Sequence, residues 1–168
     1  MQIRVETPKD YPAIADLLLA AFEQGDEARL VEKIRLSDRY IPELALVAEK
    51  EGVVVGHILF SYIDLVGAET LPVLGLAPLA VHPQYQRQGI GSALVQAGMA
   101  KAEERGEAIA IVLGHPPFYS RFGFEPSVAY GIESPFPVSA EFFMVTFLQP
   151  KRQGYAGKVI YPSAFEGL

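Results

Sequence analysis

Apolar residues recur along the chain with two different spacings, and each spacing predicts its own kind of element. Runs of consecutive or alternating apolar residues predict strands over residues 2–5, 44–50, 53–63, 73–81, 108–114, 142–148 and 158–161. Apolar residues three and four apart predict helices over residues 8–22, 27–37 and 90–105. Residues 64–72 show neither spacing, so we expect a loop there.

Capping residues mark the boundaries of the predicted helices. Thr7 and Pro8 suit the N-cap and the first position of the first helix. Gly25 is expected to end that helix, and Asp26 can cap the second. Gly106 stands after the third helix, at the position where a left-handed residue commonly ends one.

The order of the predicted elements indicates an α/β protein with one mixed sheet. Residues 44–50 and 53–63 flank a short turn, as in an antiparallel hairpin. The strands 73–81 and 108–114 are separated by a helix, which is the connection that two parallel strands require. Pro78 cannot donate to a ladder, so it predicts a bulge or an unpaired side in its strand. No repeat or linker interrupts the chain, which predicts a single domain over residues 1–168.

Composition narrows the classes of function. The chain has 168 residues, half of them apolar, and a formal net charge of −6. This acidic balance argues against general binding of nucleic acid, whose phosphates require a basic surface. No apolar run is long enough to cross a bilayer and the first residues do not resemble a signal peptide, so we expect a cytoplasmic protein with no membrane partner. There is no cysteine, and His57, His82 and His115 are too scattered for a metal site, so we expect no metal.

The segment between the strand 73–81 and the helix 90–105 carries the strongest functional signal. Residues 86–92 read Gln-Arg-Gln-Gly-Ile-Gly-Ser. The first N–H groups of a helix have no partners within the helix and bind anions, and Gly89 and Gly91 let phosphate oxygens approach the backbone. The chain has no Walker loop, and a dinucleotide-binding fingerprint would need a glycine in place of Leu94. The segment therefore predicts a phosphate or pyrophosphate site of another kind.

Two motifs together resemble a known family. Gln86, Gly89 and Gly91 match the Q-x-x-G-x-G pattern with which the GNAT superfamily of acyl-CoA-dependent N-acyltransferases binds pyrophosphate. After the next predicted strand, residues 118–124 read Phe-Tyr-Ser-Arg-Phe-Gly-Phe, similar to the GNAT motif in which a short helix that carries a tyrosine ends at Gly-Phe. The resemblance is strong over residues 53–126 and is nearest to short bacterial proteins described as predicted acetyltransferases. It implies the GNAT fold, a splayed mixed sheet flanked by helices.

The resemblance also implies a donor, a site and a reaction. The donor would be acetyl-CoA, acting without a metal, and the acceptor would be a primary amine of a small molecule or a protein. Tyr119 would give a proton to the departing thiolate. The donor-binding residues implied by the family are Leu79, Ala80, Val81, Gln86, Arg87, Gln88, Gly89, Ile90, Gly91, Ser92 and Tyr119.

Several points stay open at the level of sequence. The strand 73–81 contains no carboxylate, so the candidates for the general base are Glu23, Glu27, His115 and water. Arg87 and Arg121 would make the ligand end of the protein locally positive. A non-catalytic acyl-CoA sensor or interaction module with the same fold is the alternative to an enzyme. A homodimer is expected from the family, and the acceptor is not identified.

Overall fold

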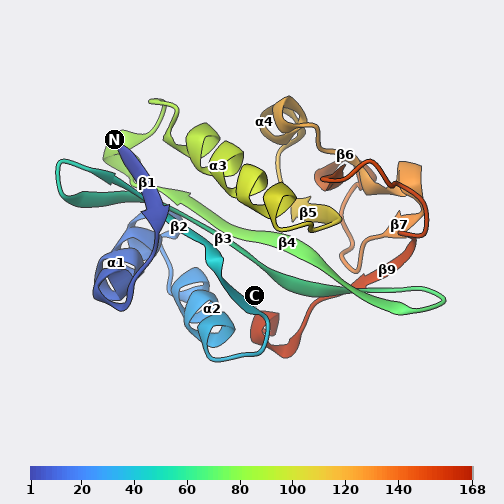
Figure 1. The fold of residues 1–168 in the computed structure, drawn as a ribbon. Coiled ribbons are helices and arrows are strands. Elements are labelled where there is room, and N and C mark those ends of the chain that lie inside the picture. Colours follow the sequence, from blue (N-terminus) through green and yellow to red (C-terminus); the bar gives the residue numbers. More distant parts are fainter. Residues whose placement is uncertain (168) are drawn as a thin grey trace.

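The computed structural model describes residues 1–167, and within them nine strands form one mixed sheet (Figure 1). The strand order is β1-β2-β3-β4-β5-β8-β6, while β9 pairs with both β3 and β7. The strands are β1 (Gln2–Val5), β2 (Tyr40–Lys50), β3 (Val53–Val66), β4 (Thr70–Val81), β5 (Ile109–Leu113), β6 (Glu125–Pro126), β7 (Ile132–Glu133), β8 (Phe143–Phe147) and β9 (Gly157–Ile160).

Helices cover both faces of the sheet. α1 (Tyr11–Phe22) and α2 (Asp26–Arg35) lie on one face, and α3 (Ile90–Glu104) lies on the other (Figure 1). The short α4 (Pro116–Tyr119) lies on the α3 side, where Tyr119 packs into the same apolar cluster as Leu94. The opposite cluster joins α1 and α2 to side chains such as Leu59 and Ala80. The predicted α/β class and mixed sheet are therefore confirmed.

The parallel crossover that the sequence predicts is present, and it is short. β4 and β5 pair only through Leu74 with Ala110 and Gly75 with Ile111 within the described residues. Among residues 1–167 these two strands have no further ladder pairs after Gly75, so they diverge. This divergence is the splay that the family resemblance implies.

Pro78 lies in a bulge, as predicted. On β3, Ile58 pairs with Leu79 and Phe60 pairs with Leu76. One residue of β3 therefore faces two residues of β4, Ala77 and Pro78. The missing N–H of the proline falls where the ladder is already interrupted.

The expected loop over residues 64–72 is wrong. β3 runs to Val66 and β4 begins at Thr70, which leaves a turn of three residues. The last residues of β3, Asp64–Val66, pair with β9. The hydrophobic pattern cannot show this pairing, because β9 is distant in the sequence. Arg39 also donates two hydrogen bonds to the Asp64 carboxylate, at 2.9 and 3.1 Å. The short strands β6 and β7 were not predicted either.

The boundaries of the first two helices differ in part from expectation. α1 ends at Phe22, as predicted, but its C-cap is Glu23, whose φ is +59°. Gly25 instead occupies the N-cap of α2, and Asp26 is the first residue of that helix.

The predicted N-cap Thr7 and first position Pro8 are confirmed, but the first turn, Pro8–Asp10, is a 3-10 turn. The Asp10 carboxylate accepts hydrogen bonds from the N–H and hydroxyl of Thr7 at 2.8 and 3.1 Å. Among residues 1–167, no helix is both long and apolar enough to cross a membrane.

Candidate active site

The glycine turn exposes the first amides of α3. Gly89 is the N-cap of this helix, with a φ of +81°, which a residue with a side chain rarely adopts. The first helical hydrogen bond runs from the N–H of Ala93 to the carbonyl of Gly89 at 3.0 Å. The N–H groups of residues 90–92 therefore have no partner within the helix, and the helix dipole adds partial positive charge beside them.

The last residues of β4 offer a second set of free backbone groups. The N–H of His82 donates to the carbonyl of Val55 on β3 at 2.8 Å. Backbone groups of successive strand residues point to opposite sides, so those of Leu79 and Val81 point away from β3, toward the gap left by β5. An extended ligand that carries amide groups can therefore add to the sheet at this edge.

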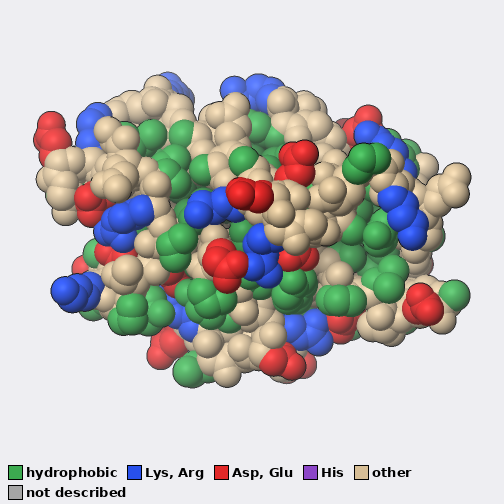
Figure 2. Space-filling view, in the orientation of Figure 1, with side chains coloured by type: hydrophobic (Ala, Val, Ile, Leu, Met, Phe, Trp, Pro, Cys, Tyr) green, Lys and Arg blue, Asp and Glu red, His purple; other side chains and the backbone are tan. Residues whose placement is uncertain are grey.

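A groove of about 730 Å³ connects these two features. In Figure 2 the surface is notched at the top of the view, between the side of the glycine turn and α4, with basic side chains on both sides of the notch. The residues that line the groove are Leu79, Val81, Gln86, Arg87, Gly89, Ile90, Gly91, Ser92, His115, Phe118 and Arg121. The groove thus brings together eight of the eleven predicted donor-binding residues, and Ala80, Gln88 and Tyr119 do not line it.

Gly91 keeps the groove open beside the free amides. A Cβ atom at this position would lie 3.7 Å from both Cζ of Phe118 and Cγ2 of Val81. The added Cβ atom would lie between Phe118 and Val81 without clashing with either, in the space that a ligand would occupy. A pyrophosphate group on the first turn of α3 fits the residues present, because this space lies next to unpartnered N–H groups.

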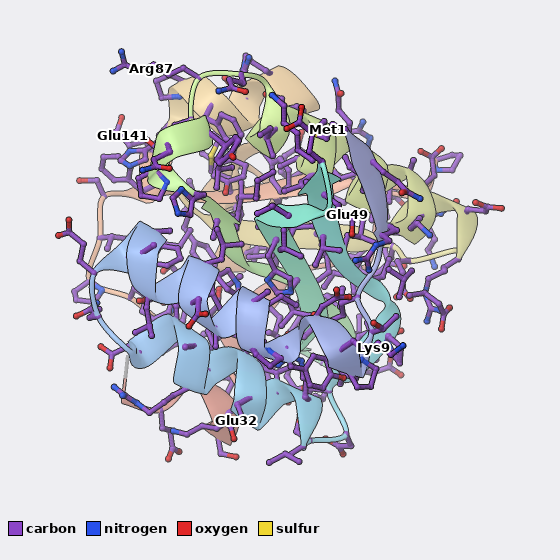
Figure 3. The ribbon with its side chains drawn as sticks, turned by 90° about the vertical axis from the view of Figure 1, so that its left-hand side faces the viewer. Met1, Lys9, Glu32, Glu49, Arg87 and Glu141 are labelled. Atoms are coloured by element: carbon purple, nitrogen blue, oxygen red, sulfur yellow. The ribbon has the colours of Figure 1, made fainter. Side chains whose placement is uncertain are left out.

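The other predicted donor-binding residues lie in different surroundings. The side-chain nitrogen of Gln86 lies 3.5 Å from the carbonyl oxygen of Val81. Gln88 accepts a hydrogen bond from Lys50 at 3.2 Å, which ties the turn to β2. The side chain of Arg87 extends outward from the molecule (Figure 3). Ala80 pairs with His57 on β3, and its side chain packs on the face of α1 and α2.

Tyr119 lies under the groove. Its side chain is 8% exposed and packs edge-to-face against Phe118 and Phe124, with ring centroids 4.9 and 5.6 Å apart. The ring also lies against Gly114, where an added Cβ would come within 2.3 Å of it. Burial raises the pKa of the Tyr119 hydroxyl to about 12. This phenol therefore stays protonated over the whole physiological range.

The three candidate bases occupy different places. His115 lines the groove and is exposed, and Glu23 is exposed at the end of α1. Glu27 lies in the first turn of α2, three and four residues before the buried Leu30 and Val31. Its Oε1 atom is buried without a hydrogen-bond partner among residues 1–167.

Phe118 and Arg121 line the groove but were not predicted to bind the donor. With His115 they form a series spaced three residues apart, which is the spacing of one face of a tight helical turn. That spacing is the signal that could have identified them. In the described part of the chain, no group of three or more His, Asp and Glu side chains could hold a metal ion.

Comparison with known proteins is consistent with this geometry. A model of the acetyltransferase (GNAT) domain matches residues 2–127. The chain is 38% identical over 166 residues to YhbS of Escherichia coli K12, described as an uncharacterized N-acetyltransferase, and the match covers 98% of each chain. It is 37% identical over 134 residues to YjhQ of the same strain, covering 79% of this chain and 74% of YjhQ.

Two solved structures are similar over almost the whole chain. The crystal structure of E. coli YhbS in complex with CoA has a TM-score of 0.89 and 38% identity, and the match covers 98% of this chain and 91% of that one. A GNAT acetyltransferase of Brucella melitensis in complex with acetyl-CoA has a TM-score of 0.81 and 30% identity, with 98% and 97% covered. The groove at the splay of β4 and β5 and these matches establish that the chain belongs to the GNAT family of acetyltransferases.

Proposed function

We propose that this protein transfers the acetyl group of acetyl-CoA to a primary amine of a small molecule or a protein. The observation that carries the proposal is the groove that joins the unpartnered amides of α3 to the free edge of β4. A pyrophosphate and an amide-containing arm need these two features at neighbouring places. The CoA and acetyl-CoA in the two similar structures support the same donor here.

Each part of the groove has its own role in holding the donor. The N–H groups of residues 90–92 bind the pyrophosphate, and Gly91 leaves room for it. The backbone of Leu79 and Val81 binds the pantetheine amides and leaves the thioester near the splay. The bound thioester supplies an activated acetyl group.

Tyr119 acts on the leaving group. With its pKa raised to about 12 by burial, the phenol is a weaker acid than a thiol of pKa about 8.5, so complete proton transfer to a thiolate is uphill. We therefore propose that the hydroxyl donates a hydrogen bond to the charge that develops on sulfur. Such a donor contributes roughly 10²-fold to the rate.

Glu27 is our choice among the candidate bases. It lies on the buried side of α2, whose Leu30 and Val31 pack in one cluster with Ala80 of the splayed strand. Its buried Oε1 atom has no hydrogen-bond partner within residues 1–167, so it is available to accept a hydrogen bond from an ammonium group of the acceptor. Glu27 would take one proton from that group and free the nitrogen lone pair to form the new C–N bond.

The test is an acetyl-transfer assay with the purified protein. The protein is incubated with acetyl-CoA and a panel of polyamines, aminoglycosides, amino acids and peptides with free N-termini. Thiol release and the mass of the amine are followed together. We expect at least one amine to gain one acetyl group as one thiol is released. Tight binding of acetyl-CoA without transfer to any amine of the panel would contradict the proposal and favour an acyl-CoA sensor.

A further inference from the structure

We propose that Arg121 binds the pyrophosphate of the donor and completes the anion site at the start of α3; this inference rests on the proposed function. Arg121 extends from the turn after α4 across the groove. Its Nη2 donates a hydrogen bond to the hydroxyl of Ser92 at 2.9 Å. Ser92 is the third residue of α3, so the guanidinium lies beside the turn whose amides have no helical partner.

Two aromatic rings hold this guanidinium in place. Its Cζ atom lies 5.0 Å from the ring centroid of Phe118 and 5.3 Å from that of Phe122. The backbone carbonyl of Phe118 also lies 3.4 Å from Nε. Contacts with ring faces restrict the side chain but leave much of its hydrogen-bonding edge available.

The charge of Arg121 is not neutralised by the protein. Within the described residues no carboxylate lies within 4.0 Å of its nitrogens, and no Asp or Glu lines the groove. The other arginines of the chain show the contrast, since five of them pair with carboxylates: Arg4, Arg29, Arg35, Arg39 and Arg105. An arginine whose hydrogen-bond acceptors are a neutral hydroxyl and a backbone carbonyl gains a charge-assisted, bidentate contact when a phosphate binds.

Arg121 is better placed for this role than Arg87. Both residues line the groove, but the side chain of Arg87 extends away from the molecule (Figure 3). Arg121 instead contacts Ser92 on the opposite wall. A phosphate on the N–H groups of residues 90–92 would therefore have α3 on one side and the Arg121 guanidinium on the other.

The experiment is a calorimetric titration of the wild type and three variants with CoA and with 3′-dephospho-CoA. The variants are Arg121→Gln, the conservative replacement Arg121→Lys and, as a matched control, Arg152→Gln, because Arg152 lies over Phe147 at 5.0 Å and does not line the groove. We expect Arg121→Gln to weaken binding of both ligands by the same factor, about 10- to 100-fold. The difference in affinity between Arg121→Gln and the wild type should shrink at high salt, because the lost interaction is electrostatic. Arg152→Gln should bind like the wild type, and Arg121→Lys should recover part of the affinity.

Three results would overturn the assignment. Wild-type affinity in Arg121→Gln would show that the residue binds no phosphate. A loss confined to CoA would place Arg121 on the 3′-phosphate instead of the pyrophosphate. An equal, salt-independent loss of affinity for both ligands, together with a lowered unfolding temperature, would mean that Arg121 only stabilises the wall of the groove formed by α4 and the turn after it. Failure of the folded wild type to bind either ligand would instead refute the proposed function itself.

Discussion

At the scale of single residues, the side chains of the α4 region that face the groove are spaced three residues apart, and a side chain between them faces the core. The groove is lined by His115, Phe118 and Arg121, whereas Tyr119, the residue after Phe118, is buried beneath it. From the sequence motif we predicted a donor-binding role for the tyrosine, whereas Arg121 was named only for its charge and His115 only as a candidate base. The position of the glycines could be predicted because a helix start without side chains is a local property. The opposite wall of the groove depends on where β5 places α4 relative to α3. A local sequence pattern carries no information on that placement.

Replacement of Tyr119 by Phe tests the role of its hydroxyl. We expect kcat to fall roughly 10- to 100-fold with little change in donor affinity, because only the hydrogen bond to the developing thiolate is lost. A pKa raised to about 12 keeps the Tyr119 phenol protonated below that pH. Deprotonation of Tyr119 should therefore cause no loss of wild-type activity up to about pH 10. Steady-state rates measured across pH check both points. An unchanged kcat in the variant would remove Tyr119 from the mechanism.

Glu27→Gln tests the proposed base, with Glu32→Gln as its control. Both glutamates belong to α2, but Glu32 is exposed on the outer side of the helix (Figure 3). We expect Glu27→Gln to lower kcat/KM for the amine by roughly 10²-fold or more and to leave the dissociation constant of acetyl-CoA unchanged. Glu32→Gln should leave both unchanged. Equal activity in the two variants would assign the proton to His115, Glu23 or water.

At the scale of elements, a buried ionic network anchors α2 beneath the sheet. The fully buried carboxylate of Glu6 accepts hydrogen bonds from Arg35 at 3.0 and 3.0 Å, from Tyr40 at 2.6 Å and from Nε2 of His57 at 2.9 Å. These partners belong to α2, β2 and β3, so one carboxylate joins three elements. The sequence predicted each element separately. It could not predict this junction, because Glu6 and His57 are distant in the chain and neither pattern marks a buried charge.

The network predicts an acid-sensitive contribution to stability. Burial alone would raise the pKa of Glu6, but the hydrogen bonds from His57, Arg35 and Tyr40 outweigh it and lower this pKa from 4.5 to about 2. Because the folded-state pKa is the lower one, the stabilisation is present above pH 4.5 and is lost as the pH falls toward 2. A shift of this size corresponds to about 3 kcal/mol.

Denaturant unfolding of wild type and Glu6→Gln at several pH values measures this contribution. We expect the variant to be less stable by about 3 kcal/mol at pH 7, and the difference to narrow steadily below pH 4.5. A difference that stays constant from pH 7 to pH 2.5 would show that the charge of Glu6 does not stabilise the fold.

At the scale of the whole molecule, the crossover determines where the site lies. In the described part of the chain, β4 and β5 share only two ladder pairs before they diverge. The glycine turn, the free edge of β4 and α4 all meet at that divergence. The fold could be predicted because two motifs occur in the right order with one strand between them. In the tail from residue 125 onward, the strands predicted over residues 142–148 and 158–161 are present as β8 and β9. The strands β6 and β7 could not be predicted, since each has two residues and pairs with a strand distant in the chain. A single domain, a homodimer and a cytoplasmic location stay predictions.

The most direct test of the central claim is a calorimetric titration with acetyl-CoA of the wild type, Gly91→Val and Ala100→Val. A side chain at position 91 would fill the space beside the free amides, whereas Ala100 is an exposed residue further along the same helix. We predict one-to-one binding by the wild type and Ala100→Val, and a loss of roughly 100-fold or more in Gly91→Val with a similar unfolding temperature. Binding that is absent in the folded wild type, or unaffected by Gly91→Val, would contradict the account.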